Sequence, residues 1–155
     1  INSNVDERYN LEKSTEVACQ YLLKAKERFG TWTLAAASYN AGMAGIANRL
    51  ESQGVNDYYD LLLGEETGRY LFRIIAIKEI LNNPEKYGFV FEKEDLYTIK
   101  KTYTIKVDTA INNIASFAKG FNINYKELKI HNPWLRENKL NNKSRKVYKI
   151  KIPRK

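Results

Sequence analysis

Three polar side chains close a short apolar segment, which is the composition of a binding cleft. Residues 32–42 read Trp-Thr-Leu-Ala-Ala-Ala-Ser-Tyr-Asn-Ala-Gly, so the apolar run 34–37 is followed by Ser38, Tyr39 and Asn40. Ligand clefts combine mostly apolar walls with a few placed polar groups. Tyr39 and Asn40 are therefore candidate binding residues, with the alternative that Asn and Gly simply end a helix.

Two further positions have the spacing and chemistry of ligand contacts. Glu66 and Tyr70 are four residues apart and share one face of a helix. The alternative is structural, because acidic residues favour a helix N-terminus and either Glu65 or Glu66 could pair with Arg69. Trp134, in Asn-Pro-Trp-Leu-Arg, suits stacking on a sugar ring or packing on a small sheet.

The sequence has few residues that could bind a metal or carry out thiol chemistry. The chain has one cysteine, Cys19, and one histidine, His131. A single residue of each type builds neither a disulfide framework nor a thiolate or His-rich metal site. We expect no metal and no cofactor, a buried Cys19 that packs as a small hydrophobe, and a structural or surface role for His131.

Charge divides the chain into two parts. Residues 1–92 contain 10 basic and 13 acidic residues, net −3, whereas residues 93–155 contain 16 and 5, net +11. A step of this size indicates a domain boundary, and the basic part should attract polyanions. No apolar run approaches the roughly 20 residues that span a bilayer. The first residues lack Met and a signal pattern, so we expect a fragment of a longer protein.

Hydrophobic periodicity predicts an α+β chain. Apolar residues at helical spacing predict helices over residues 10–29, 31–41, 43–53 and 65–82. The last is apolar on more than one face, so we expect it to be central to the core. After a connector at 84–96, alternation predicts strands at 97–107 and 146–152, with helices at 109–119 and 124–130 between them.

A series of motifs along residues 5–90 resembles the second half of the soluble-lytic-transglycosylase-like catalytic domain. Within that family it looks most like the membrane-bound lytic murein transglycosylase D group. The motifs occur in the family's order: Val5-Asp-Glu-Arg-Tyr-Asn10, Ser14-Thr15, Phe29-Gly30-x-Trp32, Ala37-Ser-Tyr-Asn-Ala-Gly42, Glu66-Thr67-x-x-Tyr70 and Asn83-Pro-Glu-Lys-Tyr-Gly88.

The basic part resembles a diverged LysM domain, a peptidoglycan-binding module. The matching segments are Tyr103-Thr-Ile-Lys-Val-Asp-Thr109, Ile114-Ala115, Leu128-x-x-x-Asn132-Pro133 and Tyr148-x-Ile-x-Ile-Pro153. It departs from the family at Val107, where a Gly is usual, and lacks the usual Pro-Gly before the last strand. The resemblances imply an all-α lysozyme-like half-domain over residues 1–90 and a strand-helix-helix-strand domain over 97–155.

The first resemblance implies a lyase that acts on peptidoglycan. Such enzymes cleave the bond between N-acetylmuramic acid and N-acetylglucosamine without water, and one Glu serves as acid and then as base while a 1,6-anhydro ring closes. The family's catalytic Glu lies in a Glu-Ser motif upstream of the Tyr-Asn-Ala-Gly segment. Glu51-Ser52 lies downstream of it, in a polar helix end, so we expect no catalytic residue in this chain and no activity from it alone.

The resemblance also implies the binding roles and the compartment. It places Tyr39, Asn40, Glu66 and Tyr70 against glycan, and we add Trp134 as a candidate contact in the second domain. Peptidoglycan strands are the expected partner, in the periplasm of a bacterial envelope, with membrane contact only through a lipid anchor outside this chain. We also expect an exposed cleft wall to promote dimerisation.

Two alternatives to an enzyme remain. One is a non-catalytic peptidoglycan-binding or scaffold protein. The other is a nucleic-acid binder, motivated by the charge of residues 93–155, although we recognise no nucleic-acid motif and basic charge alone binds polyanions indiscriminately. We expect no specific nucleic acid.

Overall fold

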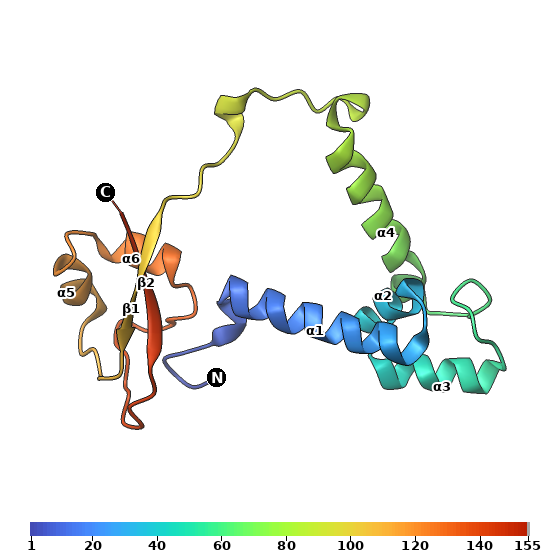
Figure 1. Cartoon of the computed structure of the whole chain (residues 1–155), viewed down its shortest axis with the longest axis horizontal. Coiled ribbons are helices and arrows are strands. Elements are labelled where there is room, and N and C mark those ends of the chain that lie inside the picture. Colours follow the sequence, from blue (N-terminus) through green and yellow to red (C-terminus); the bar gives the residue numbers. More distant parts are fainter. Residues whose placement is uncertain (155) are drawn as a thin grey trace. The chain divides into compact units, whose positions relative to one another are not determined.

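The structure of the chain is a computed structural model that describes residues 1–154. It contains two compact units (Figure 1): Glu16–Leu96, and Ile1–Thr15 together with the residues from Tyr97 onward. We call the first the helical unit and the second the LysM-like unit. Among the described residues, no helix has the length and apolar character needed to cross a membrane.

The four N-terminal helices lie where periodicity predicts them. They are α1 (Leu11–Phe29), α2 (Trp32–Ala41), α3 (Met43–Gln53) and α4 (Glu65–Asn82). Their ends are set by local chemistry. The Thr31 hydroxyl accepts a hydrogen bond from the Leu34 N–H at 3.3 Å at the start of α2, and Gly54 ends α3 with φ of 65°.

The helical unit has a small core. Its buried members come from α2, α3, α4 and the segment between α3 and α4: Leu34, Ala37, Ile46, Tyr58, Leu61 and Leu71. The Tyr58 hydroxyl donates to the Gly68 carbonyl at 2.9 Å, which ties the irregular segment to α4.

The expectation that α4 is central to the core is wrong. Leu71 is its one buried residue, and much of its apolar surface faces solvent, at Phe72, Ile74, Ile75, Ile77 and Leu81. Apolar periodicity shows which faces of a helix favour burial, and the described elements that pack against α4 cover one of them.

The expectation that Cys19 is buried is also wrong. Trp32 is 55% exposed, and Cys19 is exposed too. The buried face of α2 carries Leu34, Ala37 and Ser38, and Trp32 is out of phase with them. On α1 the buried residue is Ala25, and Cys19 lies off its face.

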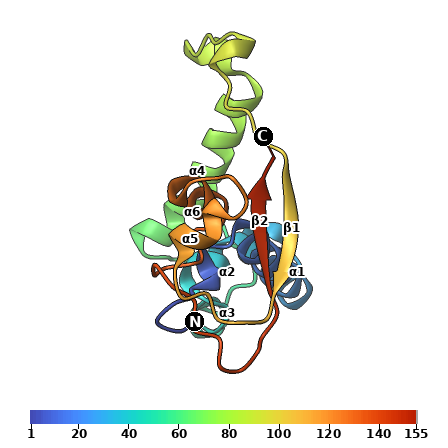
Figure 2. The same ribbon diagram turned by 90° about the vertical axis from the view of Figure 1, so that its left-hand side faces the viewer.

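The LysM-like unit has the expected strand-helix-helix-strand order. Strands β1 (Thr102–Val107) and β2 (Tyr148–Pro153) pair antiparallel, from Thr102 with Pro153 to Val107 with Tyr148. Helices α5 (Ile114–Lys119) and α6 (Tyr125–His131) pack on one side of this sheet (Figure 2). The α+β fold class is therefore confirmed.

Two elements of this unit are shorter than predicted. The strand expected from residue 97 begins at Thr102, because the pairing with β2 ends where Thr102 lies opposite Pro153. The helix expected from residue 109 begins at Ile114, because Ile111 forms a β-bridge with Leu140. The connector contains two short 3-10 helices, η2 (Pro84–Tyr87) and η3 (Lys93–Asp95).

The first fifteen residues pack with the C-terminal module although we assigned them to the helical domain. They include the 3-10 helix η1 (Glu7–Tyr9) and the first turn of α1. Val5 is 2% exposed and belongs to the core of the LysM-like unit. The domain boundaries 1–90 and 97–155 stay a prediction about which family each segment comes from. By packing, the chain divides after Thr15 and after Leu96.

This packing gives the LysM-like unit a defined response to acid. Hydrogen bonds from Arg8 lower the pKa of Asp6 from its usual 3.8 to about 2. A carboxyl with a lowered pKa stabilises the fold above its ordinary pKa, and this contribution is lost as the pH falls through the folded value. We expect the thermal midpoint of the chain to fall between about pH 4 and about pH 2.

The Asp6→Asn variant should show a flatter profile over that range, measured by circular dichroism. The control is Glu79→Gln, which changes a carboxyl in the helical unit. It should leave the acid response of the Trp134 fluorescence unchanged. If Asp6→Asn and the unchanged protein lose stability in parallel, Asp6 has no such role.

Candidate functional site

The end of α2 is held by one buried backbone carbonyl. Ser38 is fully buried, and its carbonyl oxygen accepts hydrogen bonds from the Tyr21 hydroxyl at 2.6 Å and from the Gly42 N–H at 2.7 Å. Gly42 has φ of 79°, a conformation that side chains resist. Helix α1 and the turn into α3 are thereby fixed to the same point of α2.

Tyr39 projects from this fixed point toward solvent. Its side chain is 46% exposed, and its ring meets the Tyr21 ring edge to face, with centroids 5.5 Å apart and an interplanar angle of 82°. Edge-to-face contact orients an aromatic ring while leaving much of its surface accessible. Tyr39 therefore presents a partly held ring and a hydroxyl that can meet a ligand.

Asn40 joins α2 to the start of α4. Its side-chain oxygen accepts a hydrogen bond from the Thr67 hydroxyl at 2.8 Å. This contact spans 27 residues of sequence and brings the C-terminal end of α2 beside the first turn of α4. Tyr39 and Asn40 thus lie near the helix turn that carries Glu66.

One face of α4 forms a shallow groove of about 570 Å³, which we call the α4 groove. Apolar side chains line its length, with charged and amide groups at intervals: Glu66, Tyr70, Arg73, Ile74, Ile77, Lys78, Leu81 and Asn82. Glu65, and not Glu66, forms the ion pair with Arg69, at 2.8 Å. The structure places Glu66 and Tyr70 together in the α4 groove, and Tyr39 and Asn40 lie outside its lining.

Trp134 belongs to the core of the LysM-like unit. It is 4% exposed and stacks on Tyr148, with ring centroids 5.6 Å apart and an interplanar angle of 18°. This arrangement matches the packing alternative for Trp134, and a ring covered in this way offers no free face for a sugar.

Acid–base chemistry has little support among the described carboxyl groups. The carboxyls whose pKa departs clearly from the usual range all depart downward: Asp6, Glu7, Glu12, Glu79 and Glu127. The main cause is a hydrogen bond from Arg8, Lys13, Lys151 or Lys86, or, at Glu127, from the Asn124 backbone N–H. General acids are tuned the other way, by apolar surroundings that raise the pKa.

Metal binding has no geometric support either. Residues 1–154 bring together no group of three or more His, Cys, Asp or Glu side chains that would hold a metal ion. The Glu51-Ser52 pair is exposed on the last turn of α3, and Glu51 lines an open pocket there together with Phe29, Leu50 and Val55.

Sequence reasoning missed three residues of this region. Arg73 and Lys78 line the α4 groove, and a continuation of the three- and four-residue spacing beyond Tyr70 would have found them. Thr67 was quoted as part of a motif, but its contact with Asn40 has no local signal in the sequence.

Comparison with known proteins connects both parts of the chain to one enzyme class. Residues 1–62 match the transglycosylase SLT domain, and residues 103–155 match the soluble lytic transglycosylase C-terminal LysM-like domain. The chain is related to the lytic murein transglycosylases.

Two curated relatives carry that name. The chain is 29% identical over 90 residues to membrane-bound lytic murein transglycosylase D of Escherichia coli strain K12, and equally to that of strain CFT073 of Escherichia coli O6:H1. Each match covers 55% of this chain and 20% of the relative. The chain therefore spans about one fifth of the length of these transglycosylases.

The matched ranges divide the candidate residues. Tyr39 and Asn40 fall inside the SLT match and Trp134 inside the LysM-like match, whereas Glu66 and Tyr70 lie between the two. The Asn40–Thr67 hydrogen bond is therefore one observed link between the SLT-matched residues and the helix that forms the α4 groove.

Replacing Thr67 by Val tests this link. The substitution keeps the shape of the side chain and leaves the half-buried Asn40 oxygen without its donor, which should lower the free energy of unfolding by about 1 kcal/mol. Urea denaturation measures the change. Thr15→Val, at an exposed position of α1, should change it by less than about 0.5 kcal/mol, and equal effects at both sites would show that the hydrogen bond carries no net stability.

Proposed function

We propose that this chain is a part of a peptidoglycan lytic transglycosylase that supplies a section of the glycan cleft and a wall-binding module. The parent protein would cleave the bond between N-acetylmuramic acid and N-acetylglucosamine without water and release 1,6-anhydro ends. It would act in the periplasm of a bacterial envelope, on peptidoglycan strands.

This reaction needs one carboxyl group where ordinary glycosidases need two. In a hydrolase the second carboxylate acts as nucleophile or activates water. When the C6 hydroxyl of the substrate attacks instead, one group can protonate the leaving oxygen and then accept the hydroxyl proton. Such a group works best with a raised pKa in an apolar cleft, and the shifted carboxyl groups of this chain depart in the opposite direction.

One observation carries the proposal: SLT and LysM-like sequences occur in tandem on one chain. The geometry of the helical unit supports it. Tyr39, Glu66 and Tyr70 offer one partly exposed ring and two polar groups beside an apolar face. A sugar ring presents apolar C–H faces and a rim of hydroxyls, so a mixed surface of this kind suits it.

The exposed apolar side chains of α4 also favour self-association. Ile74, Ile77 and Leu81 lie on one helix face and are 43%, 58% and 74% exposed. Contiguous exposed apolar surface promotes association, so the proposal includes dimerisation of the isolated chain through α4.

A non-catalytic wall-binding protein is the second candidate function. The observation that favours it is the exposed position of Glu51 at the end of α3, in the only Glu-Ser pair of the sequence. In that case the glycan surface would remain and the chemistry would be absent from the parent protein as well.

Binding to purified peptidoglycan sacculi tests the shared part of both proposals. We expect the chain to co-sediment with sacculi in the presence of excess DNA and at moderate salt. Tyr39→Ala and Glu66→Gln should each weaken retention about fivefold, which corresponds to roughly 1 kcal/mol for one lost contact. Tyr59→Ala, which removes another exposed tyrosine of the helical unit, is the matched control.

Two comparisons decide the outcome: retention with and without DNA or salt, and retention of Tyr39→Ala against that of Tyr59→Ala. If DNA or salt removes the chain from the pellet, binding rests on the basic residues alone. If Tyr59→Ala weakens retention as much as Tyr39→Ala does, the assigned glycan residues are wrong.

Digestion of sacculi tests the assignment of chemistry. We expect the chain alone to release no 1,6-anhydro-muropeptides above a buffer blank, measured by chromatography and mass spectrometry. Release of these products, and its loss in Glu51→Gln, would show that the catalytic carboxyl is in this chain after all.

A further inference from the structure

Residues Asn2–Lys13, which we call the N-terminal segment, make an ordered set of contacts with the C-terminal part of the LysM-like unit. The Asp6 N–H donates to the Trp134 carbonyl at 2.9 Å, and the Arg136 N–H donates to the Asn4 carbonyl at 2.8 Å. These bonds flank an antiparallel bridge between Val5 and Leu135. The segment thus pairs with the module as a short β-strand would.

Burial shows that this pairing is part of the core. Asn4, Val5 and Asp6 are 4%, 2% and 7% exposed, and Val5 packs in the same cluster as Leu135 and Leu140. The Asn4 side-chain oxygen accepts a hydrogen bond from the Asn141 N–H at 3.1 Å, across 137 residues of sequence. A buried amide and a buried apolar side chain are costly to expose, so the contact is more than a surface association.

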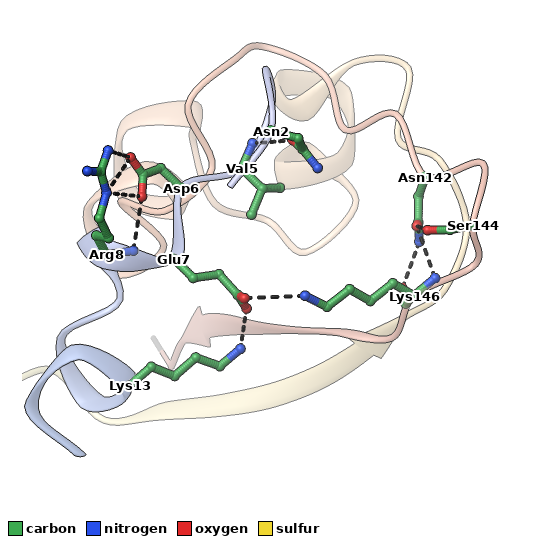
Figure 3. Close-up of polar contacts among 9 residues, drawn as sticks. All are labelled: Asn2, Val5, Asp6, Glu7, Arg8, Lys13, Asn142, Ser144 and Lys146. Atoms are coloured by element: carbon green, nitrogen blue, oxygen red, sulfur yellow. Dashed lines mark hydrogen bonds and ion pairs between the residues drawn. The ribbon is translucent and has the colours of Figure 1, made fainter. Parts of the chain in front are cut away.

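Charge complements the apolar contact. Glu7 lies between Lys13 and Lys146, with 3.3 Å to the Lys146 amine (Figure 3), and Glu12 pairs with Lys151. The Arg136 guanidinium lies 4.3 Å from the centre of the Tyr9 ring. Exposed ion pairs contribute little each, but they select an acidic partner for a module whose residues 93–155 carry a net charge of +11.

The family match makes this arrangement unexpected. The SLT match begins at residue 1 and ends at residue 62, and the LysM-like match begins at residue 103. The N-terminal segment therefore has transglycosylase-domain sequence but packs in the LysM-like unit.

We propose that residues 132–146 of the LysM-like unit form a docking surface for the N-terminal segment of the same chain. The segment completes the module, so the module is not independent of the transglycosylase sequence. The N-terminal segment covers the loop after α6. It also holds Trp134, because the Asp6 N–H donates to the Trp134 carbonyl. This inference does not depend on the proposed function.

A disulfide bond tests docking in the intact chain. Val5 and Leu135 are a pair without mutual hydrogen bonds, whose Cα atoms lie about 4.5 Å apart in regular sheets, within the range that a disulfide spans. In a Cys19→Ser background, Val5→Cys with Leu135→Cys should oxidise with glutathione disulfide to an intramolecular bond in most molecules. Mass spectrometry and non-reducing electrophoresis detect it, and the same variant in urea gives the baseline.

Oxidation no faster than in urea would overturn the proposal. Disulfide-linked dimers in place of cross-linked monomers would overturn docking within one chain.

Hydrogen exchange provides a second test that does not depend on the cysteines. Val5→Asp should accelerate exchange of the Arg136 and Asn141 amides at least about tenfold, because both donate to Asn4. Val90→Asp places the same change at a 77% exposed position of the connector and should leave both amides unchanged. Loss of protection at Leu128 as well would mean that the module needs the segment to fold. Unchanged exchange at Arg136 and Asn141 would overturn the proposal.

Discussion

The helical unit depends on how the buried Ser38 carbonyl is satisfied. A buried carbonyl without a partner is costly, and at Ser38 two donors from different elements, the Tyr21 hydroxyl and the Gly42 N–H, converge on one oxygen. The second donor reaches it because Gly42 adopts a positive φ of 79°. Once α1, α2 and the turn to α3 are fixed there, the next two residues, Tyr39 and Asn40, have little choice of direction. The candidate site is thus a consequence of backbone hydrogen bonding.

Local chemistry made the helices predictable, whereas long-range packing did not show in the sequence. Thr31 and Gly54 mark helix ends through bonds to residues a few positions away, so their meaning can be read from the sequence. The exposure of α4 cannot, since periodicity at Ile74 and Ile77 is the same whether or not a neighbour covers them. The same limit applies to Val5, whose partners Leu135 and Leu140 are about 130 residues away in sequence.

The candidate site was predictable in part for the same reason. The four-residue spacing of Glu66 and Tyr70 is a local relation, and both line the α4 groove. The placement of Tyr39 and Asn40 beside the start of α4 depends on contacts between α2 and α4, among them the bond between Asn40 and Thr67, which no helical spacing encodes. Trp134 shows the opposite case, because its residue type suits both stacking on sugar and packing, and only burial against Tyr148 distinguishes them.

Charge and shape assign different tasks to the two units. The helical unit Glu16–Leu96 carries 9 basic and 12 acidic residues, net −3, so the remaining +11 belongs to the LysM-like unit with its N-terminal segment. Attraction to an anionic polymer therefore comes from the LysM-like unit, and it should weaken with salt because the Debye length is about 8 Å at physiological ionic strength. The α4 groove is mostly apolar, and contacts of that kind are insensitive to screening. The proposed recognition of glycan by shape and the proposed attraction to the wall by charge are thus separable in this chain, since each is assigned to a different unit and responds to a different condition.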